Sequence, residues 1–406
     1  SHPQEESHGD FATNVAMHLA KQVKQNPLQL AGLIAEALRN EADLKDIVDR
    51  VEVAKPGFIN LFLKKEALAA EVGVLLKQGD RYGSGKSKKE KVLVEYSQMN
   101  VAKPMHVGHL RTMFLGDSLK RLYAFAGYEV ISDTHYGDWG TQFGMVLYAF
   151  KHWGDEQKVK EDQVNELVRL YIDMDKKIEA DTTLREAAKA EFKKLEDGDK
   201  DNLKLCKWFV DASVDVFEQM YKRLDILPFD YNLGESYYES LMKKDVKDLL
   251  ASGIATQEGN MIYVDLEKYK LGRCIFIKSD GASTYHLRDL STYRHRIKKL
   301  KTNRNLYVVD SRQSHHFKQL FKVVELLGWP GLAKTEHVSY GFITLPEGSL
   351  STRKGRIVQA IDVINEGFKR SHAVIEEKNP DLKDKDAVAA EVTRAAIKFA
   401  NLLANR

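Results

Sequence analysis

Apolar positions in the first eighty residues predict a small α+β unit. Between residues 10 and 40 they recur at helical spacing, at Phe11, Val15, Leu19 and Val23 and again from 28 to 38. Residues 51–63 (VEVAKPGFINLFL) are instead strand-like, with a Pro-Gly turn in the middle. Residues 79–90 are polar and rich in Gly, Ser and Lys, which predicts a linker.

The pattern changes at residue 91, where a strand–helix–strand unit is predicted. Residues 92–96 form a short apolar, β-prone run typical of a buried parallel strand. Residues 107–125 then show helical periodicity, and Gly127 stands where a helix ends. Residues 129–132 predict the next strand.

A second set of alternating elements is predicted downstream. Strands are expected at 274–278 and 306–309, and helices at 289–300 and 313–327, with Gly328 ending the last helix. Strands that alternate with helices predict an α/β fold with a doubly wound parallel sheet, whose ligands bind beyond the carboxyl ends of the strands. The charged residues between these sets, at about 150–250, predict a helical insertion, and the chain is helical again after residue 358.

Composition places the chain among soluble proteins of two to four domains. It has 406 residues, 43% hydrophobic and 30% charged, and no apolar run long enough to span a membrane. Cys206 and Cys274 lie far apart without clustered histidines, which predicts free buried thiols, no zinc site and a cytoplasmic location. The net charge of +3 neither requires nor excludes a nucleic-acid partner. Because the chain begins at Ser1, we expect its natural start to be missing.

One phosphate-binding pattern in the linker is rejected. Residues 83–87 (GSGKS) resemble the end of a P-loop, but Asp80 stands where that motif requires glycine. The motif also needs an amphipathic helix after it, whereas Lys-rich sequence follows here. We therefore do not expect a P-loop.

The strongest chemical signal is His106-Val107-Gly108-His109, which follows the first strand and opens the first helix. A helix N-terminus presents free N–H groups and partial positive charge to a phosphate. Two histidines can add hydrogen bonds to a triphosphate, and the glycine allows a flat base to approach. In isolation such histidines could equally satisfy helix-end groups, but the strand–turn–helix context favours nucleotide binding.

Residues 100–111 (NVAKPMHVGHLR) closely resemble the first signature of class I aminoacyl-tRNA synthetases, in the form found in arginyl-tRNA synthetases. Further blocks are similar to that family and follow in its order: 8–17 (HGDFATNVAM), 136–144 (YGDWGTQFG), 285–290 (YHLRDL), 307–317 (YVVDSRQSHHF) and 349–355 (SLSTRKG). The last resembles the second class I signature. The resemblance covers nearly the whole chain.

The resemblance implies a domain order. Residues 1–80 would be the additional domain that touches the tRNA elbow, and 81–90 the linker. Residues 91–358 would be the Rossmann-like catalytic domain with its insertion. Residues 359–406 would be a helical stem, and we expect the anticodon-binding domain of the family to follow Arg406.

The implied activity is that of an arginine–tRNA ligase acting as a monomer. The carboxylate of L-arginine would attack the α-phosphate of ATP, supplied with Mg²⁺, and the arginyl group would pass to the 3′-terminal adenosine of tRNA(Arg), first on its 2′-hydroxyl. An anion attacks a polyanion, so the protein must position reactants and neutralise charge. No tightly bound metal or organic cofactor is expected.

The resemblance also assigns residue roles. The expected catalytic residues are Lys103, His106, His109, Ser351, Arg353 and Lys354. The expected ATP-binding residues are His106, Gly108, His109, Asp138, Gly140, His316 and Ser351. The expected arginine-binding residues are Glu95, Asn100, His106, Tyr285, Asp289 and Gln313. Carboxylates suit the five donors of a guanidinium, and Asp289 lies one helical turn from Tyr285.

Two positions depart from the family pattern. The second signature normally opens with lysine, and here this position is Ser349; in such members the lysine before the first signature, Lys103, is thought to compensate. Gln98-Met99 replaces the usual Ser-Pro. Two alternatives follow: an adenylylating paralogue, which should lack the arginine pocket, and a silent tRNA- or protein-binding module, which should show degraded signatures.

Overall fold

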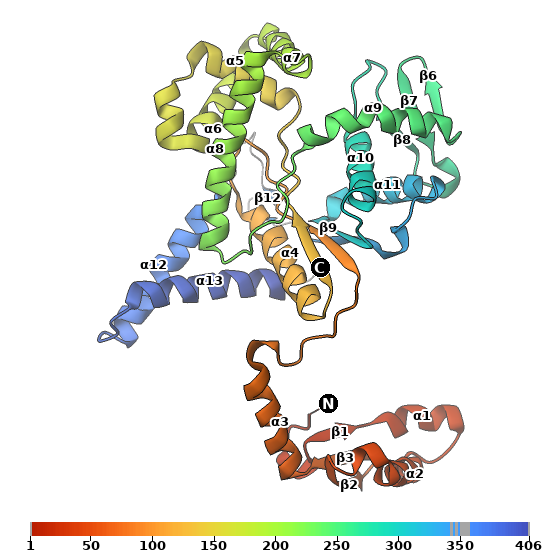
Figure 1. Ribbon diagram of the computed structural model, residues 1–406. Helices are drawn as coiled ribbons and strands as arrows, with labels where there is room; N and C mark the ends of the chain where they lie inside the picture. The colour runs from red at the N-terminus through yellow and green to blue at the C-terminus, as the bar shows by residue number, and fades with distance from the viewer. Residues whose placement is uncertain (1, 342–343, 346–347, 350–357, 405–406) are drawn as a thin grey trace. The chain divides into compact units, whose positions relative to one another are not determined.

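The computed structural model describes residues 2–341, 344–345, 348–349 and 358–404 (Figure 1). Contacts within the chain divide it into two units, Ser1–Ser84 and Gly85–Arg406. Each unit has a hydrophobic core of its own. The boundary between them falls in the polar segment for which a linker was predicted.

The first unit is a three-stranded antiparallel sheet, in the order β1–β3–β2, packed against helices. Its elements are β1 (Phe11–Thr13), α1 (Val15–Val23), α2 (Pro27–Asn40), β2 (Val48–Ala54), β3 (Phe58–Leu63) and α3 (Lys65–Gln78), with 3-10 turns at Glu6–His8, Ala42–Leu44 and Gly79–Arg81. Ala31 and Ala35 of α2 are fully buried beside Ile59 of β3. The two helices and the two strands around a Pro-Gly turn are confirmed, but the helical prediction was wrong at Phe11, because residues 11–13 form β1 by pairing with β3.

The second unit is built on a four-stranded parallel sheet in the order β10–β9–β4–β5. These strands are β4 (Lys91–Glu95), β5 (Glu129–Asp133), β9 (Arg304–Asp310) and β10 (Thr335–Tyr340). Helix α4 (Val107–Phe125) connects β4 to β5, and α11 (Ser314–Leu326) connects β9 to β10. The predicted α/β fold with a parallel sheet is confirmed.

The predicted linker is fastened to the end of α4. The N–H groups of Gly85 and Lys88 donate to the carbonyl oxygens of Phe125 (2.7 Å) and Gly127 (2.9 Å). A Cβ atom on Gly85 would lie 2.2 Å from the carbonyl oxygen of Ala126, so only glycine fits this approach. A P-loop would be followed by a helix, whereas strand β4 follows here, in agreement with the rejection of that motif.

One expected strand belongs to a different sheet. We predicted residues 274–278 as part of the parallel sheet, but β8 (Arg273–Ile277) pairs antiparallel with β7 (Met261–Asp265), and β7 pairs with β6 (Ala255–Glu258). Phe276 and Cys274 are buried against α10 (Tyr285–Lys298) and α11. The prediction was wrong because periodicity reports that a strand is buried but not which strand it pairs with.

The remaining described segments are mainly helical. The insertion contains α5 (Thr141–Trp153), α6 (Glu156–Ala180), α7 (Thr183–Glu196), α8 (Lys200–Arg223) and α9 (Glu235–Ala251), and the last helices are α12 (Ala360–Lys378) and α13 (Lys385–Leu403). Short elements complete the list: 3-10 turns at Glu267–Tyr269, Ser311–Gln313 and Leu332–Lys334, and the two-residue strands β11 (Thr344–Leu345) and β12 (Gly348–Ser349). Cys206 and Cys274 are free and buried, as predicted. Across the described ranges, no helix combines the length and apolarity that crossing a membrane requires.

Candidate active site

The candidate site lies at the carboxyl edge of the parallel sheet, between β4 and β9. The connection from β4 leads through α4 to β5 on one side, and that from β9 leads through α11 to β10 on the other. Neighbouring strands whose connections diverge leave a crevice at their carboxyl ends, the usual ligand site of such sheets. Helix α4 stays close to this edge because the hydroxyl of Thr112 donates to the carbonyl oxygen of Val308 on β9 (2.8 Å).

His106 and His109 cap the N-terminus of α4 in a reciprocal arrangement. Nδ1 of His106 accepts from the N–H of Gly108 (3.1 Å), and Nδ1 of His109 accepts from the N–H of His106 (3.1 Å). The two rings are stacked with centroids 3.6 Å apart. Because each Nδ1 is an acceptor, the hydrogen of each neutral ring is on Nε2, which can donate to a ligand. The histidines therefore bind helix N–H groups and still offer donors.

Both histidines are held in the neutral form near pH 7. Burial lowers the pKa of His106, and the positive charges of Arg312 and Lys103 lower it further. Burial lowers the pKa of His109 well below its usual value, with added effects of His106 and Lys103. Arg312 and Lys103 therefore lie near the histidine pair. Sequence reasoning missed Arg312, whose Nε and Nη2 donate to the two carboxylate oxygens of Asp310 (both 2.9 Å).

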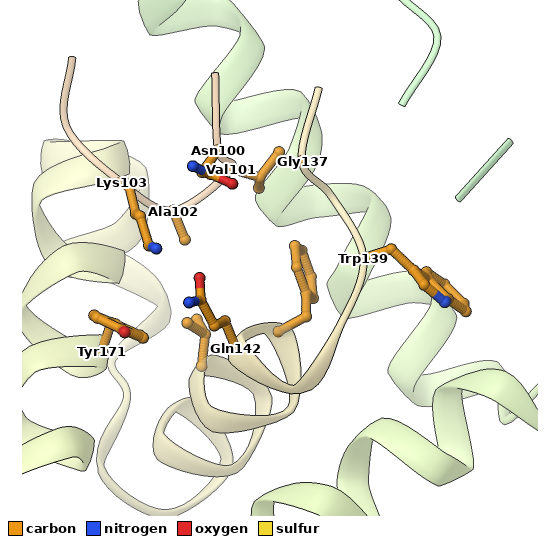
Figure 2. Close-up of a pocket in the computed structure, with 10 residues that line it drawn as sticks. Asn100, Val101, Ala102, Lys103, Gly137, Trp139, Gln142 and Tyr171 are labelled. Carbon is orange, nitrogen blue, oxygen red and sulfur yellow. The ribbon is translucent and has the colours of Figure 1, made fainter. Parts of the chain in front are cut away.

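Lys103 and Asn100 lie on the loop between β4 and α4, where they line a small hollow with residues of α5 and α6 (Figure 2). Nζ of Lys103 is 5.3 Å from the centre of the Tyr171 ring. Figure 2 shows Lys103, Gln142 and Tyr171 converging on this hollow. The loop thus places a cation and an amide close to the start of α4.

Asp289 on α10 is held by two imidazoles. Nε2 of His316, on α11, is 2.5 Å from Oδ2, and Nε2 of His135, just after β5, is 3.7 Å from Oδ1. Burial alone would raise the pKa of Asp289, but the hydrogen bond and charge of His316 and the charges of His135 and His286 lower it overall. An ionised carboxylate therefore lies at the carboxyl edge, where β5 and β9 end.

Two other predicted arginine-binding residues are accessible, and one is already paired. Tyr285 is 62% exposed and Gln313 is exposed. Glu95, in contrast, is buried at the end of β4: Oε2 lies 2.5 Å from Nη2 of the fully buried Arg296, and Oε1 accepts from Gln98 (2.8 Å). Sequence reasoning found Glu95 but not this pairing.

Asp133 and Tyr307 complete the surroundings of Arg296. Nη2 of Arg296 also donates to Asp133 Oδ2 (3.0 Å), and its guanidinium lies 5.1 Å from the ring centre of Tyr307. The opposite charges of Glu95 and Asp133 raise the pKa of Arg296, whereas burial opposes this. An internal arginine thus ties together the ends of β4 and β5.

The predicted ATP residues Asp138 and Gly140 lie on the loop before α5. The Asp138 carboxylate accepts from the N–H (2.9 Å) and hydroxyl (2.6 Å) of Ser236, and so caps the start of α9. Burial raises the pKa of Asp138, and these hydrogen bonds oppose the rise. Gly140 begins α5 with φ +117°, a conformation that favours glycine. The structure therefore gives both residues structural contacts.

Ser351, Arg353 and Lys354 lie outside the described residues. The residues just beyond them, however, are bonded to the first signature. The N–H of Val107 donates to the carbonyl oxygen of Val358 (3.0 Å), and the N–H of Ala360 donates to that of Met105 (2.9 Å). The chain after the second signature is thus anchored beside His106.

Sequence reasoning also missed a charged cluster next to Asp289. Nε of Arg288 lies 3.1 Å from Glu235, and Nη1 lies 3.7 Å from Glu239, both on α9. Burial raises the pKa of Glu239 to about 7, although the charge of Arg288 opposes this. No signal in the sequence linked these residues, because the strands of the antiparallel sheet lie between α9 and α10 along the chain.

In the part of the chain that the structure describes, no group of three or more His, Cys, Asp or Glu side chains is placed to hold a metal ion.

Comparison with protein families gives two matches. The family described as "tRNA synthetases class I (R), catalytic domain" matches residues 71–406, and "Arginyl tRNA synthetase N terminal domain" matches residues 1–63. The arginine–tRNA ligase of Fusobacterium nucleatum is 38% identical over an alignment of 406 positions, which covers 99% of this chain and 69% of that protein. That of Clostridium perfringens is 39% identical over 400 residues, covering 98% of this chain and 69% of that protein.

Solved structures give the same picture. The arginyl-tRNA synthetase of Thermus thermophilus superposes with a TM-score of 0.75 at 25% identity, covering 99% of this chain and 71% of that one. The enzyme of Plasmodium falciparum gives 0.74 at 27% identity, covering 98% and 68%.

Proposed function

This chain belongs to the arginyl-tRNA synthetase family of class I enzymes, and from that membership we propose which of its residues hold each substrate. The function is arginine–tRNA ligation: ATP activates L-arginine as arginyl-adenylate, and the arginyl group is transferred to tRNA. The adenylylating paralogue and the silent binding module are thereby set aside. The observation that carries the assignment of roles is the histidine pair at the start of α4, whose Nδ1 atoms accept from the backbone and whose Nε2 atoms are therefore donors.

We assign the phosphates of ATP to the start of α4. His106 and His109 donate from Nε2 to phosphate oxygens, and Gly108 allows the adenosine to approach the backbone. Neutral imidazoles suit this role because they donate hydrogen bonds without taking up a proton from the medium. Lys103 and Arg312 supply the positive charge that a developing pyrophosphate needs, since catalysis here consists of positioning and charge stabilisation. The effect of both cations on the pKa of His106 supports their place in the site.

The second signature completes the ATP site in this proposal. Ser351, Arg353 and Lys354 close over the pyrophosphate. The backbone hydrogen bonds that join Val358 and Ala360 to the first signature support this role. Mg²⁺ enters bound to the triphosphate, as part of the substrate, because phosphate oxygens are the ligands it prefers. Gly140 and Asp138 contribute through the loop before α5, and Asp138 does so by fixing α9.

We assign the guanidinium of arginine to Asp289, with Tyr285 beside it on α10. An ionised carboxylate pairs with a guanidinium through two parallel hydrogen bonds, and the lowered pKa of Asp289 supports this form. Asn100, Gln313 and His106 hold the amino and carboxyl groups near ATP. Glu95 acts from the end of β4, where its pairing with Arg296 and Gln98 fixes its orientation.

The remaining assignments concern the whole chain. We propose that residues 1–80 contact tRNA(Arg), that 81–90 are the linker, and that 91–358 and 359–406 are the catalytic domain and its stem. The amino acid and ATP sites come from one chain, which supports a monomer. Two buried free cysteines support the reducing cytoplasm as its location.

The test is ATP–pyrophosphate exchange that depends on arginine, measured with and without tRNA(Arg). We expect exchange with arginine but not citrulline, because a neutral ureido group cannot form a charged pair with the carboxylate of Asp289. In Asp289→Asn the KM for arginine should rise by about 30-fold or more, since a charged hydrogen-bonded pair is worth about 2–5 kcal/mol. A matched control is Asp386→Asn. It removes a carboxylate on α13 that pairs with His372 on α12. Asp289→Asn with an unchanged KM for arginine would refute the assignment.

A further inference from the structure

We propose that His135 and His316 are positioning residues for arginine, which clamp the Asp289 carboxylate from two sides so that it meets the guanidinium in a fixed orientation. The proposal rests on the assignment of arginine to Asp289. It also gives His316 a role different from the ATP contact expected from the sequence. Neither imidazole need touch the substrate, because each acts through the carboxylate.

His316 fixes one oxygen of the Asp289 carboxylate. Its Nε2 lies 2.5 Å from Oδ2 of Asp289, within hydrogen-bond distance, and its side chain is only 11% exposed. Behind it, the ring of His286 lies 4.3 Å away, and that of Phe317 lies 5.3 Å away. His286 is itself fixed, because its Nε2 lies 3.0 Å from Oε1 of Gln319. The orientation of His316 is therefore set by packing.

His286 is a neutral group where its ring packs against that of His316. Burial and the charge of His316 lower the pKa of His286 to about 4, although Asp289 opposes this. Gln319 holds the ring because its own Nε2 donates to the carbonyl oxygen of Leu271 (2.7 Å), which makes its Oε1 the acceptor from His286. Donor and acceptor are thus defined between Gln319 and His286, and the ring of His286 in turn packs against that of His316.

His135 approaches the other oxygen from the loop that follows β5. Its Nε2 lies 3.7 Å from Oδ1 of Asp289, and its side chain is 10% exposed. Its backbone adopts φ +47°, in the left-handed region that is costly for residues other than glycine. The ring packs at 5.6 Å from that of Tyr238. A backbone conformation of this kind, at a residue whose imidazole lies beside the carboxylate of Asp289, is typical of a functional position.

The clamp leaves room for the substrate. A carboxylate has about four lone-pair sites, and the two histidines use at most one on each oxygen. Two sites remain for the parallel hydrogen bonds of a guanidinium. Nδ1 of His316 and of His135 are both buried without a hydrogen-bond partner among the described residues. His316 reaches Asp289 at hydrogen-bond distance and His135 at ion-pair distance.

The experiment measures binding of arginine and of ATP separately, by calorimetry, and KM for each in ATP–pyrophosphate exchange with tRNA present. His316→Phe fills the space without a donor, and we expect it to weaken arginine binding by about tenfold or more, as the loss of a hydrogen bond to a charged group does. Binding of ATP should change by less than about twofold. His316→Gln, which restores an N–H donor, should recover part of the loss, and His135→Phe should act in the same direction as His316→Phe.

A double-mutant cycle shows whether the histidine acts through Asp289. In the Asp289→Asn background, His316→Phe should no longer weaken arginine binding, because the group that it positions is lost. The control is His372→Gln, which disrupts a histidine–carboxylate pair on α12 and α13, where Nε2 of His372 lies 3.2 Å from Asp386. It should leave both ligands unaffected.

The outcomes separate this inference from the proposed function. If Asp289→Asn leaves arginine binding intact, the proposed function fails. If Asp289→Asn weakens arginine binding but His316→Phe does not, or weakens ATP binding instead, only the clamp is overturned. Circular dichroism reports whether each variant folds; if His316→Phe does not fold, His316→Gln and His135→Phe must each weaken arginine selectively, and failure to do so overturns the clamp.

Discussion

At the scale of single residues, the histidine pair combines a structural and a chemical role. A helix N-terminus leaves N–H groups without partners, and the Nδ1 atoms of His106 and His109 satisfy two of them. This use of Nδ1 fixes the tautomer of each neutral ring and makes Nε2 its donor. The two interpretations that the sequence left open, helix capping and nucleotide binding, are therefore compatible, because they use different nitrogens of the same rings.

The depressed pKa of His109 predicts how stability depends on pH. In the unfolded chain this histidine takes up a proton near pH 6.5, whereas in the folded protein burial holds its pKa well below that value. The unfolded state therefore binds more protons as the pH falls below about 6.5, and the free energy of unfolding decreases until the folded pKa is reached. His109→Asn keeps an acceptor but cannot titrate, so it should lose less stability than the native chain between pH 7 and pH 5.

The measurement is thermal unfolding at both pH values. His152→Gln is a suitable control, because His152 is exposed and its Nδ1 contacts only the carbonyl oxygen of Tyr148 at 2.8 Å. It should lose as much stability as the native chain. Equal losses in His109→Asn and the native chain would show that His109 is not held neutral by the fold.

The geometry around a site residue was predictable where a short motif carries it and not where distant segments meet. The HVGH pattern identified His106 and His109 because strand, turn and helix are adjacent in sequence. Asp289 was found from the resemblance of its block, but its partners His135 and His316 come from two other connections. The pairing of Glu95 with Arg296, about 200 positions away, needs the tertiary fold, as does the closeness of Arg312 to His106.

At the scale of elements, α4 must approach the end of β4 very closely. A Cβ atom on Gly116 would lie 2.1 Å from Cγ and 2.3 Å from Cβ of Tyr96, which is fully buried. These atoms are near the backbone of Tyr96, so the clash cannot be relieved by rotating the end of a flexible side chain. Gly116 therefore sets the distance between the helix that carries the histidines and the strand that carries Glu95.

Gly116→Ala should destabilise the second unit by about 1–3 kcal/mol, because overpacking a buried contact outweighs the gain in helix propensity. The expected signature in urea unfolding is a lower midpoint, accompanied by weaker ATP binding as α4 is displaced. Gly32→Ala is the matched control within a helix, since no atom lies within 4 Å of its added Cβ. That change should be neutral or stabilising by up to about 1 kcal/mol. A Gly116→Ala chain as stable as the native one would mean that the approach to Tyr96 is not tight.

Elements were predicted well where their neighbours in sequence are also neighbours in space. The first strand–helix–strand unit matches β4, α4 and β5 to within a residue or two, and Gly127 ends the helix with φ +92°. Residues 273–277 were recognised as a strand but placed in the wrong sheet. Their partner β7 was not predicted, and the edge strand β6 is mostly exposed, so its apolar pattern is weak.

At the scale of the whole molecule, the chain divides its work between two units with separate cores. The catalytic family matches residues 71–406, and the N-terminal family matches residues 1–63. The residues assigned to ATP and arginine all belong to the second unit, as do the contacts that fix Gly85 and Lys88 to the end of α4. Only the proposed contact with tRNA depends on the first unit.

A chain of residues 85–406 should therefore bind ATP and arginine as the native chain does, while its affinity for tRNA(Arg) falls. The tRNA contact proposed for the first unit would be lost, and since binding to phosphates releases counterions, the salt dependence of tRNA binding should change with it. Calorimetry measures the small ligands, and filter binding at several salt concentrations measures tRNA. A chain of residues 91–406, which also lacks the hydrogen bonds of Gly85 and Lys88, should unfold at a lower temperature than the 85–406 chain, because the end of α4 loses two partners. Loss of arginine binding in a folded 85–406 chain would contradict this division, and unchanged tRNA affinity would contradict the role proposed for the first unit.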